Sequence, residues 1–72
     1  MRDQRHTEVN VLGYRIERLQ KIDDRGGISA QWYEVLAPES EALLGSFEHR
    51  AEAEREIITR ELRALPRLSA AY

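Results

Sequence analysis

The stretch ISAQWYEVLAPESEALLGSFEHRAEAEREIITRELRAL, residues 28–65, decides the fold. Residues 28–37 contain the β-branched and aromatic side chains that favour strands. Pro38 cannot donate to a strand ladder, so it ends this strand, and the polar residues after it form a turn. Residues 43–47 predict a short edge strand. The remainder predicts a helix, and the rest of the chain is interpreted around this strand–strand–helix unit.

The helix is predicted from Arg50 to Leu65. Glu52 lies three residues after His49, which is the spacing of a capping box with a weak cap, and Ser46 is an alternative start. Proline follows Leu65, and the residue before proline avoids the helical region, so the helix ends there. The apolar residues that recur at helical spacing are Ala53, Ile57, Ile58, Leu62 and Leu65.

Residues 9–22 predict one long strand. Leu12, Tyr14 and Ile16 alternate on one face, and Gly13 marks a bulge or a close approach of another backbone. Residues 23–27, DDRGG, are a strong turn signal and predict a hairpin to the strand that begins at residue 28.

The predicted fold class is α+β, with a three-stranded antiparallel sheet in β-β-β-α order and one C-terminal amphipathic helix packed on one face. The predicted domain covers residues 9–65. Residues 1–8 are predicted to be a flexible arm, because they are polar and terminal, and residues 66–72 a short tail. A chain of 72 residues builds a core worth only ~3–5 kcal/mol. Good packing of the helix on the sheet, or self-association, therefore has to contribute to the stability of the fold.

The two sheet faces are hard to tell apart from the sequence. Trp32 and Tyr33 are adjacent in a strand, so they point to opposite faces and cannot both meet the helix. A one-residue choice of register decides which of them is in the core. Because apolar residues occupy both faces and one helix covers one face, we expect the other face to be an exposed apolar patch.

Composition excludes several kinds of chemistry. The chain has no cysteine, so disulfides and cysteine-ligated metal are excluded. His6 and His49 match no metal-ligand pattern, and no serine stands in a nucleophile elbow. We therefore expect no enzyme activity, no metal and no cofactor. No stretch reaches the ~20 apolar residues of a membrane span, and residues 1–8 are no signal peptide. The expected location is the cytoplasm.

Charge is unevenly distributed along the chain, whose formal net charge is −2. Residues 26–48 carry four glutamates and no lysine or arginine, which makes this segment an acidic block. An acidic block does not favour nucleic acid, because phosphate neutralisation dominates that binding. It is either an ordinary solvated turn or a surface that fits a basic groove on another protein.

The residues from Trp32 to Glu54 resemble a known arrangement. The runs WYEV (32–35), GSFEH (45–49) and AEAE (51–54) are similar to the strand, turn and capped helix of small sheet-then-helix modules. These include the arm-binding N-terminal domains of tyrosine recombinases and several bacterial and phage families. The resemblance implies fold rather than DNA binding, because the matching strand here carries no cation. A looser likeness, in size, acidity and lack of cysteine, is to phage inhibitors of host defence complexes such as anti-CRISPR proteins.

The function predicted is that of a small bacterial or phage accessory protein that binds another protein, either a host complex that it inhibits or a second copy of itself. The partner-binding residues predicted are Trp32, Tyr33, Glu34, Glu39 and Glu41. The alternative is a nucleic-acid-binding module, and its predicted contacts are Arg15, Arg18, Arg60 and Arg63. The arginine-rich composition, in which Lys21 is the one lysine, is typical of GC-rich coding sequences.

Overall fold

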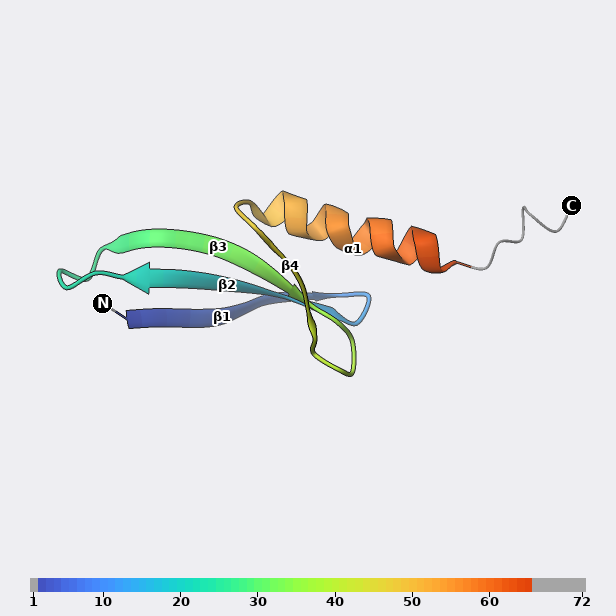
Figure 1. Cartoon of the computed structure of the whole chain (residues 1–72), viewed down its shortest axis with the longest axis horizontal. Helices are drawn as coiled ribbons and strands as arrows, with labels where there is room; N and C mark the ends of the chain where they lie inside the picture. Colours follow the sequence, from blue (N-terminus) through green and yellow to red (C-terminus); the bar gives the residue numbers. More distant parts are fainter. Residues whose placement is uncertain (1, 66–72) are drawn as a thin grey trace, which may run out of the picture.

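The structure, a computed structural model, describes residues 2–65. Four strands form one antiparallel sheet in the order β1-β2-β3-β4, and a C-terminal helix follows (Figure 1). The elements are β1 (Arg2–Val11), β2 (Tyr14–Ile22), β3 (Ile28–Leu36), β4 (Leu43–Phe47) and α1 (Arg50–Ala64). The α+β class, the antiparallel sheet and the C-terminal helix are confirmed, whereas the prediction of three strands is wrong.

The extra strand arises where one long strand was predicted. Leu12 and Gly13 both have positive φ, 53° and 89°, and Val11 pairs with Tyr14 across them. Two consecutive residues with positive φ make the tight turn of a two-residue hairpin. Residues 9–22 are therefore the end of β1, a turn and β2. Gly13 is a turn residue, and a Cβ there would meet the ring of Pro38 at 3.6 Å.

The expected flexible arm is also corrected. Residues 2–8 belong to β1, which pairs with β2 from Arg2 opposite Ile22 to Thr7 opposite Glu17. A bulge follows Thr7, before the pair of Val9 and Ile16. Polar composition does not prevent a strand here, because β2 supplies backbone partners for residues 2–7. The predicted tail, residues 66–72, lies outside the described residues.

The hairpin predicted at residues 23–27 is confirmed. The Asp23 carboxylate accepts hydrogen bonds from the backbone N–H groups of Arg25 and Gly27, each at 2.9 Å. Gly26 has φ of 84°, and its N–H donates to the Asp23 carbonyl at 3.0 Å. Aspartate and glycine act here as turn residues.

α1 begins and ends close to the predicted positions. The Glu52 carboxylate accepts a hydrogen bond from the His49 backbone N–H at 3.2 Å, as the capping-box spacing predicted. Leu65, at the C-terminal end, is extended, with φ of −62° and ψ of 143°. The proline after it explains this conformation.

The core lies between the first half of α1 and one face of the sheet. Ile16 of β2, Val35 of β3, and Ala53 and Ile57 of α1 are fully buried there. Tyr33 packs against this cluster, so Tyr33 is on the helix side of the sheet. The partly buried side chains that complete the core are Val9, Val11, Tyr14, Leu44 and Phe47.

β4 reaches the core because Gly45 leaves space for an aromatic ring. A Cβ at Gly45 would lie 2.9 Å from Cζ of Phe47, which is closer than side-chain atoms tolerate. Phe47 pairs with Tyr33 of β3. Gly45 thus lets the Phe47 ring lie against its own strand and fill the space beside α1.

Candidate functional site

The face of the sheet that α1 does not cover, here named the open face, carries Trp32. Arg5, Leu19 and Trp32 lie side by side on β1, β2 and β3, because Arg5 pairs with Leu19 and Leu19 with Trp32. Leu19 is only 7% exposed. The Trp32 indole N–H lies 3.4 Å from Oε2 of Glu34. The prediction that one of the two adjacent aromatics lies away from the helix is confirmed, and Trp32 is that residue.

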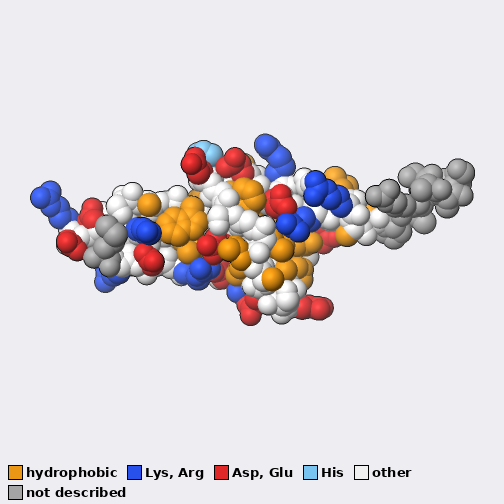
Figure 2. All heavy atoms as spheres, in the orientation of Figure 1, with side chains coloured by type: hydrophobic (Ala, Val, Ile, Leu, Met, Phe, Trp, Pro, Cys, Tyr) orange, Lys and Arg blue, Asp and Glu red, His pale blue; other side chains and the backbone are white. Residues whose placement is uncertain are grey.

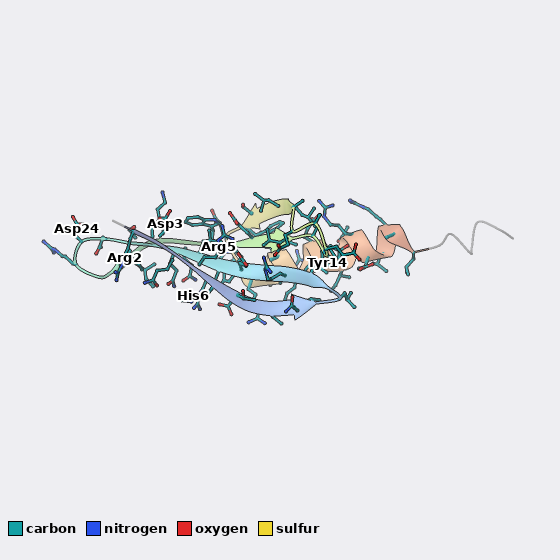
Figure 3. All side chains as sticks on the ribbon, turned by 90° about the horizontal axis from the view of Figure 1, so that it is seen from below. Arg2, Asp3, Arg5, His6, Tyr14 and Asp24 are labelled. Carbon is teal, nitrogen blue, oxygen red and sulfur yellow. The ribbon has the colours of Figure 1, made fainter. Side chains whose placement is uncertain are left out.

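Next to this row, two arginines and three glutamates form what we name the open-face ladder. Arg5 contacts Glu17 and also lies 3.0 Å from Glu34. Arg15 Nε lies 2.7 Å from Glu17 and Arg15 Nη2 lies 2.6 Å from Glu41. Glu17 is 5% exposed, so its charge is buried between two guanidinium groups. Figure 3 shows Arg5 along the sheet, between the end that carries Arg2 and the end that carries Tyr14.

The carboxylates raise the pKa of both arginines above the ordinary value. For Arg5 the largest cause is the hydrogen bond to Glu17, with smaller contributions from Glu34. For Arg15 the largest cause is the hydrogen bond to Glu41. Both cations therefore remain charged wherever the fold is stable, and they neutralise part of the acidic block from within the chain.

The five predicted partner-binding residues do not form one surface. Trp32 and Glu34 share the open face, whereas Tyr33 is on the helix side. Glu39 and Glu41 lie in the β3–β4 loop with φ of 65° and 58°. Glu34 and Glu41 are ion-paired in the ladder, and Glu39 has no ion pair among the described residues.

The four arginines of the nucleic-acid alternative are also separated. Arg15 belongs to the open-face ladder, and Arg18 pairs with Glu8 at 2.9 Å. Arg60 is held by Glu56 at 2.6 Å and points toward the Leu44 carbonyl at 3.4 Å. Arg63 lies in the last turn of α1. Three of the four are therefore already neutralised within the chain.

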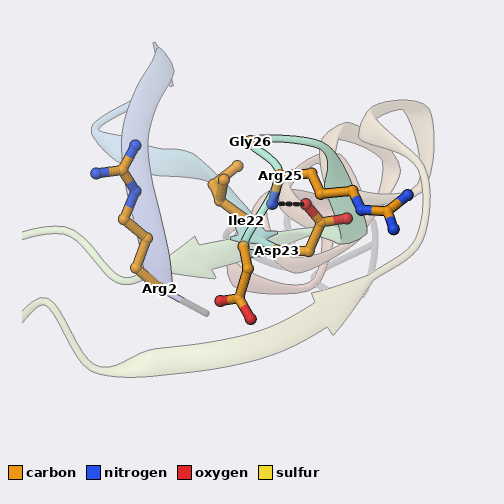
Figure 4. Close-up of a pocket in the computed structure, with 6 residues that line it drawn as sticks. Arg2, Ile22, Asp23, Arg25 and Gly26 are labelled. Carbon is orange, nitrogen blue, oxygen red and sulfur yellow. Dashed lines mark hydrogen bonds between the residues drawn. The ribbon is translucent and has the colours of Figure 1, made fainter.

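A surface hollow of about 500 Å³ lies at the β2–β3 hairpin (Figure 4). Its lining residues are Arg2, Ile22, Asp23, Asp24, Arg25 and Gly26. The Asp23 carboxylate is committed to the turn, and the lining offers no nucleophile beside a base. The hollow is thus a consequence of the turn geometry.

The surface that sequence reasoning did not single out is on α1. Ile58, Leu62 and Leu65 are 52%, 64% and 57% exposed, and spacings of four and three put them on one stripe of the helix. We name this stripe the outer seam. Successive helical residues point about 100° apart, so when Ile57 faces the sheet, Ile58 cannot. The adjacent residues Ile57 and Ile58 were therefore the signal in the sequence that α1 has an apolar residue facing away from the sheet.

The outer seam lies where the helix has left the sheet. Ala53 and Ile57, the buried residues of α1, are in its first half, and the second half extends past the strands (Figure 1). Leu12, in the β1–β2 turn, and Leu43, the first residue of β4, are 67% and 57% exposed. Figure 2 shows hydrophobic side chains on the half of the molecule where β4 and α1 lie and also over the strands toward the other end. Ile28 is the large exposed apolar residue at the opposite end.

Comparison of the chain with protein-family models, curated proteins and solved structures finds no match. Within residues 2–65, no helix is long and apolar enough to cross a membrane. In the same residues, no three histidine, cysteine, aspartate or glutamate side chains cluster in a way that suits a metal ion. The proposed function is therefore inferred from the chemistry of the surfaces described above.

Proposed function

We propose that this chain is a non-enzymatic protein-binding module that acts in the cytoplasm and binds through the outer seam of α1. The observation that supports this most is the placement of Ile58, Leu62 and Leu65, which are more than half exposed on one helix stripe. Exposed apolar groups gathered in one place usually mark an interaction surface. Anchors at i, i+4 and i+7 are how an amphipathic helix binds an apolar groove or another helix.

The outer seam is a better candidate than the open face around Trp32. On the open face, Leu19 and Leu36 are already 7% and 8% exposed, and the ladder covers the neighbouring area with charge. A partner would gain little further apolar burial there. On the seam, a partner could remove more than half of each of three large side chains from water, at about 25 cal/mol for each Å².

Cross-linking in cells tests the proposal. The chain should cross-link to a protein, and Leu62→Glu should lower the yield at least tenfold, because a charge in the seam opposes burial. Ile28→Glu is the matched control, since Ile28 is 56% exposed at the other end of the molecule. Equal loss in both variants, or no loss in Leu62→Glu, would reject the seam.

The surface predicted from the sequence, around Trp32 and the acidic block, has its own test. Trp32→Ala removes the open-face aromatic without touching the core, whereas Tyr33→Ala also damages the packing around α1. Glu39→Lys is the clean charge reversal, because reversing Glu34 or Glu41 breaks the ladder as well. Loss of binding in Trp32→Ala and Glu39→Lys, with Leu62→Glu unaffected, would favour an inhibitor that occupies a basic groove.

The nucleic-acid alternative predicts an affinity that falls steeply with salt. Because Arg15, Arg18 and Arg60 are paired in the chain, Arg63 is the variant to use. Binding of DNA or RNA at low salt that Arg63→Ala weakens would support this alternative over protein binding.

A further inference from the structure

We propose that the outer edge of β1 pairs with the β1 edge of a second copy of this chain, in antiparallel orientation and centred on Gln4. β1 is the first strand in the sheet order β1-β2-β3-β4, so a neighbouring strand lies on one side of it only. The backbone N–H and C=O groups on its other side are a template for a further strand. This edge is separate from the outer seam, so the inference goes beyond the function proposed above.

The register of the sheet shows which residues of β1 direct backbone groups outward. Val11 and Tyr14 close a two-residue turn, so they form a hydrogen-bonded pair. From Tyr14 onward, every second residue of β2 directs its N–H and C=O toward β1. Before the bulge, the partners of these β2 residues are positions 2, 4 and 6 of β1. The outward groups on this part of the edge therefore belong to Asp3, Arg5 and Thr7.

Residues 2–7 lack several features that commonly prevent two sheet edges from pairing. Those features include proline, lysine, a bulge and a covering helix or loop. Residues 2–7 contain no proline and no lysine, and the bulge of β1 lies beyond them, after Thr7. α1 extends away from the end of the sheet at which β1 begins (Figure 1). Within the described part of the chain, this half of the edge is thus accessible to another strand.

The charges of β1 select a second copy and a single register. Residues with outward groups have to face each other, so every antiparallel register of two β1 strands is centred on one residue. Centring on Gln4 places Asp3 opposite Arg5 of the second copy, and Arg5 opposite Asp3 of that copy. Centring on Asp3 or on Arg5 would instead place like charges opposite each other, which destabilises a strand pair. Registers further along β1 meet the bulge after Thr7.

Gln4 itself suits a position on the two-fold axis. It lies opposite Gln20 of β2, which lies opposite Gln31 of β3, and Gln20 Nε2 donates to Gln31 Oε1 at 2.6 Å. Three glutamines therefore form a row across the sheet that ends at the β1 edge. A primary amide both donates and accepts hydrogen bonds, so the Gln4 amide of a second copy complements this one. Pairing would continue the row across both sheets.

The pair is expected to be weak. Only residues 2–6 of each strand lie opposite one another, and Arg5 is already shared with Glu17 and Glu34. A contact of this size is at the low end of specific interfaces. We expect monomers at about 5 µM and dimers at about 500 µM.

Sedimentation equilibrium on the full chain tests the proposal. The mass should rise from 8.4 kDa toward twice that value between these concentrations. Asp3→Arg should weaken association about tenfold or more, because two attractive pairs become repulsive. Glu48→Arg is the matched control, since it makes the same change of charge at an exposed residue outside the strands, and it should associate as the wild type does. Equal association of Asp3→Arg and wild type, or a wild type that is monomeric at about 500 µM, would overturn the proposal.

Cysteine pairing tests the register, since the chain has no cysteine of its own. Gln4→Cys should oxidise quickly to a disulfide-linked dimer, because position 4 lies opposite itself and directly opposite residues are within disulfide range. His6→Cys, on the same face of β1, is the control and should oxidise slowly, because the two copies of position 6 are about 13 Å apart along the strands. Faster oxidation of His6→Cys would contradict this register. A dimer that Leu62→Glu abolishes and Asp3→Arg leaves intact would place the contact on α1 and overturn the edge pairing.

Discussion

Glu17 is the residue on which the open face depends. Its carboxylate is 5% exposed and contacts Arg5 on one side and Arg15 on the other. Glu34 lies opposite Glu17 on the neighbouring strand, and Arg5 contacts both. A buried carboxylate is tolerated when its charge is paired, and it destabilises the fold strongly when a partner is removed. The ladder thus allows two adjacent glutamates to share one face of the sheet.

Arg5→Ala is therefore expected to destabilise the fold by about 1–2 kcal/mol, because Glu17 and Glu34 lose their shared cation. This destabilisation is smaller than for a fully buried ion pair, because the Arg5 side chain is 49% exposed and water screens its charge. The urea midpoint should fall by roughly 1 M or more. Arg25→Ala, an exposed cation in the β2–β3 turn, is the control and should leave the midpoint unchanged. Equal midpoints for Arg5→Ala and wild type would contradict the ladder.

The stabilisation by Arg5 should not depend on pH between 7 and 9. The pKa of Arg5 is raised in the folded protein, so its contribution is fully present below the ordinary arginine pKa. It is lost only as the pH rises through the raised value, far above this range. The urea-midpoint difference between wild type and Arg5→Ala should be the same at pH 7 and pH 9. A difference that shrinks by half at pH 9 would point to another titrating group.

At the scale of elements, the β1–β2 hairpin is unusual because a leucine occupies a turn position with positive φ. Leu12 adopts a left-handed backbone with φ of 53°, which is unfavourable for leucine. Its side chain is 67% exposed, so burial of the side chain does little to offset this strain. Leu12→Asn should raise stability by about 1 kcal/mol, because asparagine suits the first position of this turn. A thermal melt should show an increase of about 4–8 °C. Ile28→Asn, at an exposed site without positive φ, should give no increase in melting temperature. A similar increase in that variant would show that the effect does not come from the backbone conformation of the turn.

The same hairpin shows where sequence reasoning reached its limit. The turn at residues 23–27 was predictable because DDRGG contains the residues that tight turns require. Leu12-Gly13 has one such residue, so the alternation of apolar side chains across it indicated a single strand. β1 was missed for a related reason, since its polar residues are stabilised by pairing with β2.

The sequence predicted where the helix begins and ends, but not which of its apolar residues are buried. The spacing of Glu52 from His49 and the proline after Leu65 placed both ends. Periodicity grouped Leu62 and Leu65 with Ala53 and Ile57, yet only the last two are buried. Burial depends on how far the sheet extends beneath the helix, which is a tertiary property. The ladder could not be assigned before the register of the sheet was known, because the register places Arg5, Arg15 and Glu17 on one face.

At the scale of the whole molecule, the fold combines a small core with an exposed apolar end. The fully buried apolar residues of the core cluster are Ile16, Val35, Ala53 and Ile57. A core of this size gives marginal stability to a chain of 72 residues. A partner bound to the outer seam would add burial where the chain alone lacks it.

The most direct test of the central claim, that the outer seam is the binding surface, is cross-linking in cells of the wild type, Leu62→Glu and Ile28→Glu side by side. The account predicts a yield at least tenfold lower for Leu62→Glu and an unchanged yield for Ile28→Glu, whose site is also more than half exposed, at the other end of the molecule. Equal yields for the three proteins would contradict it.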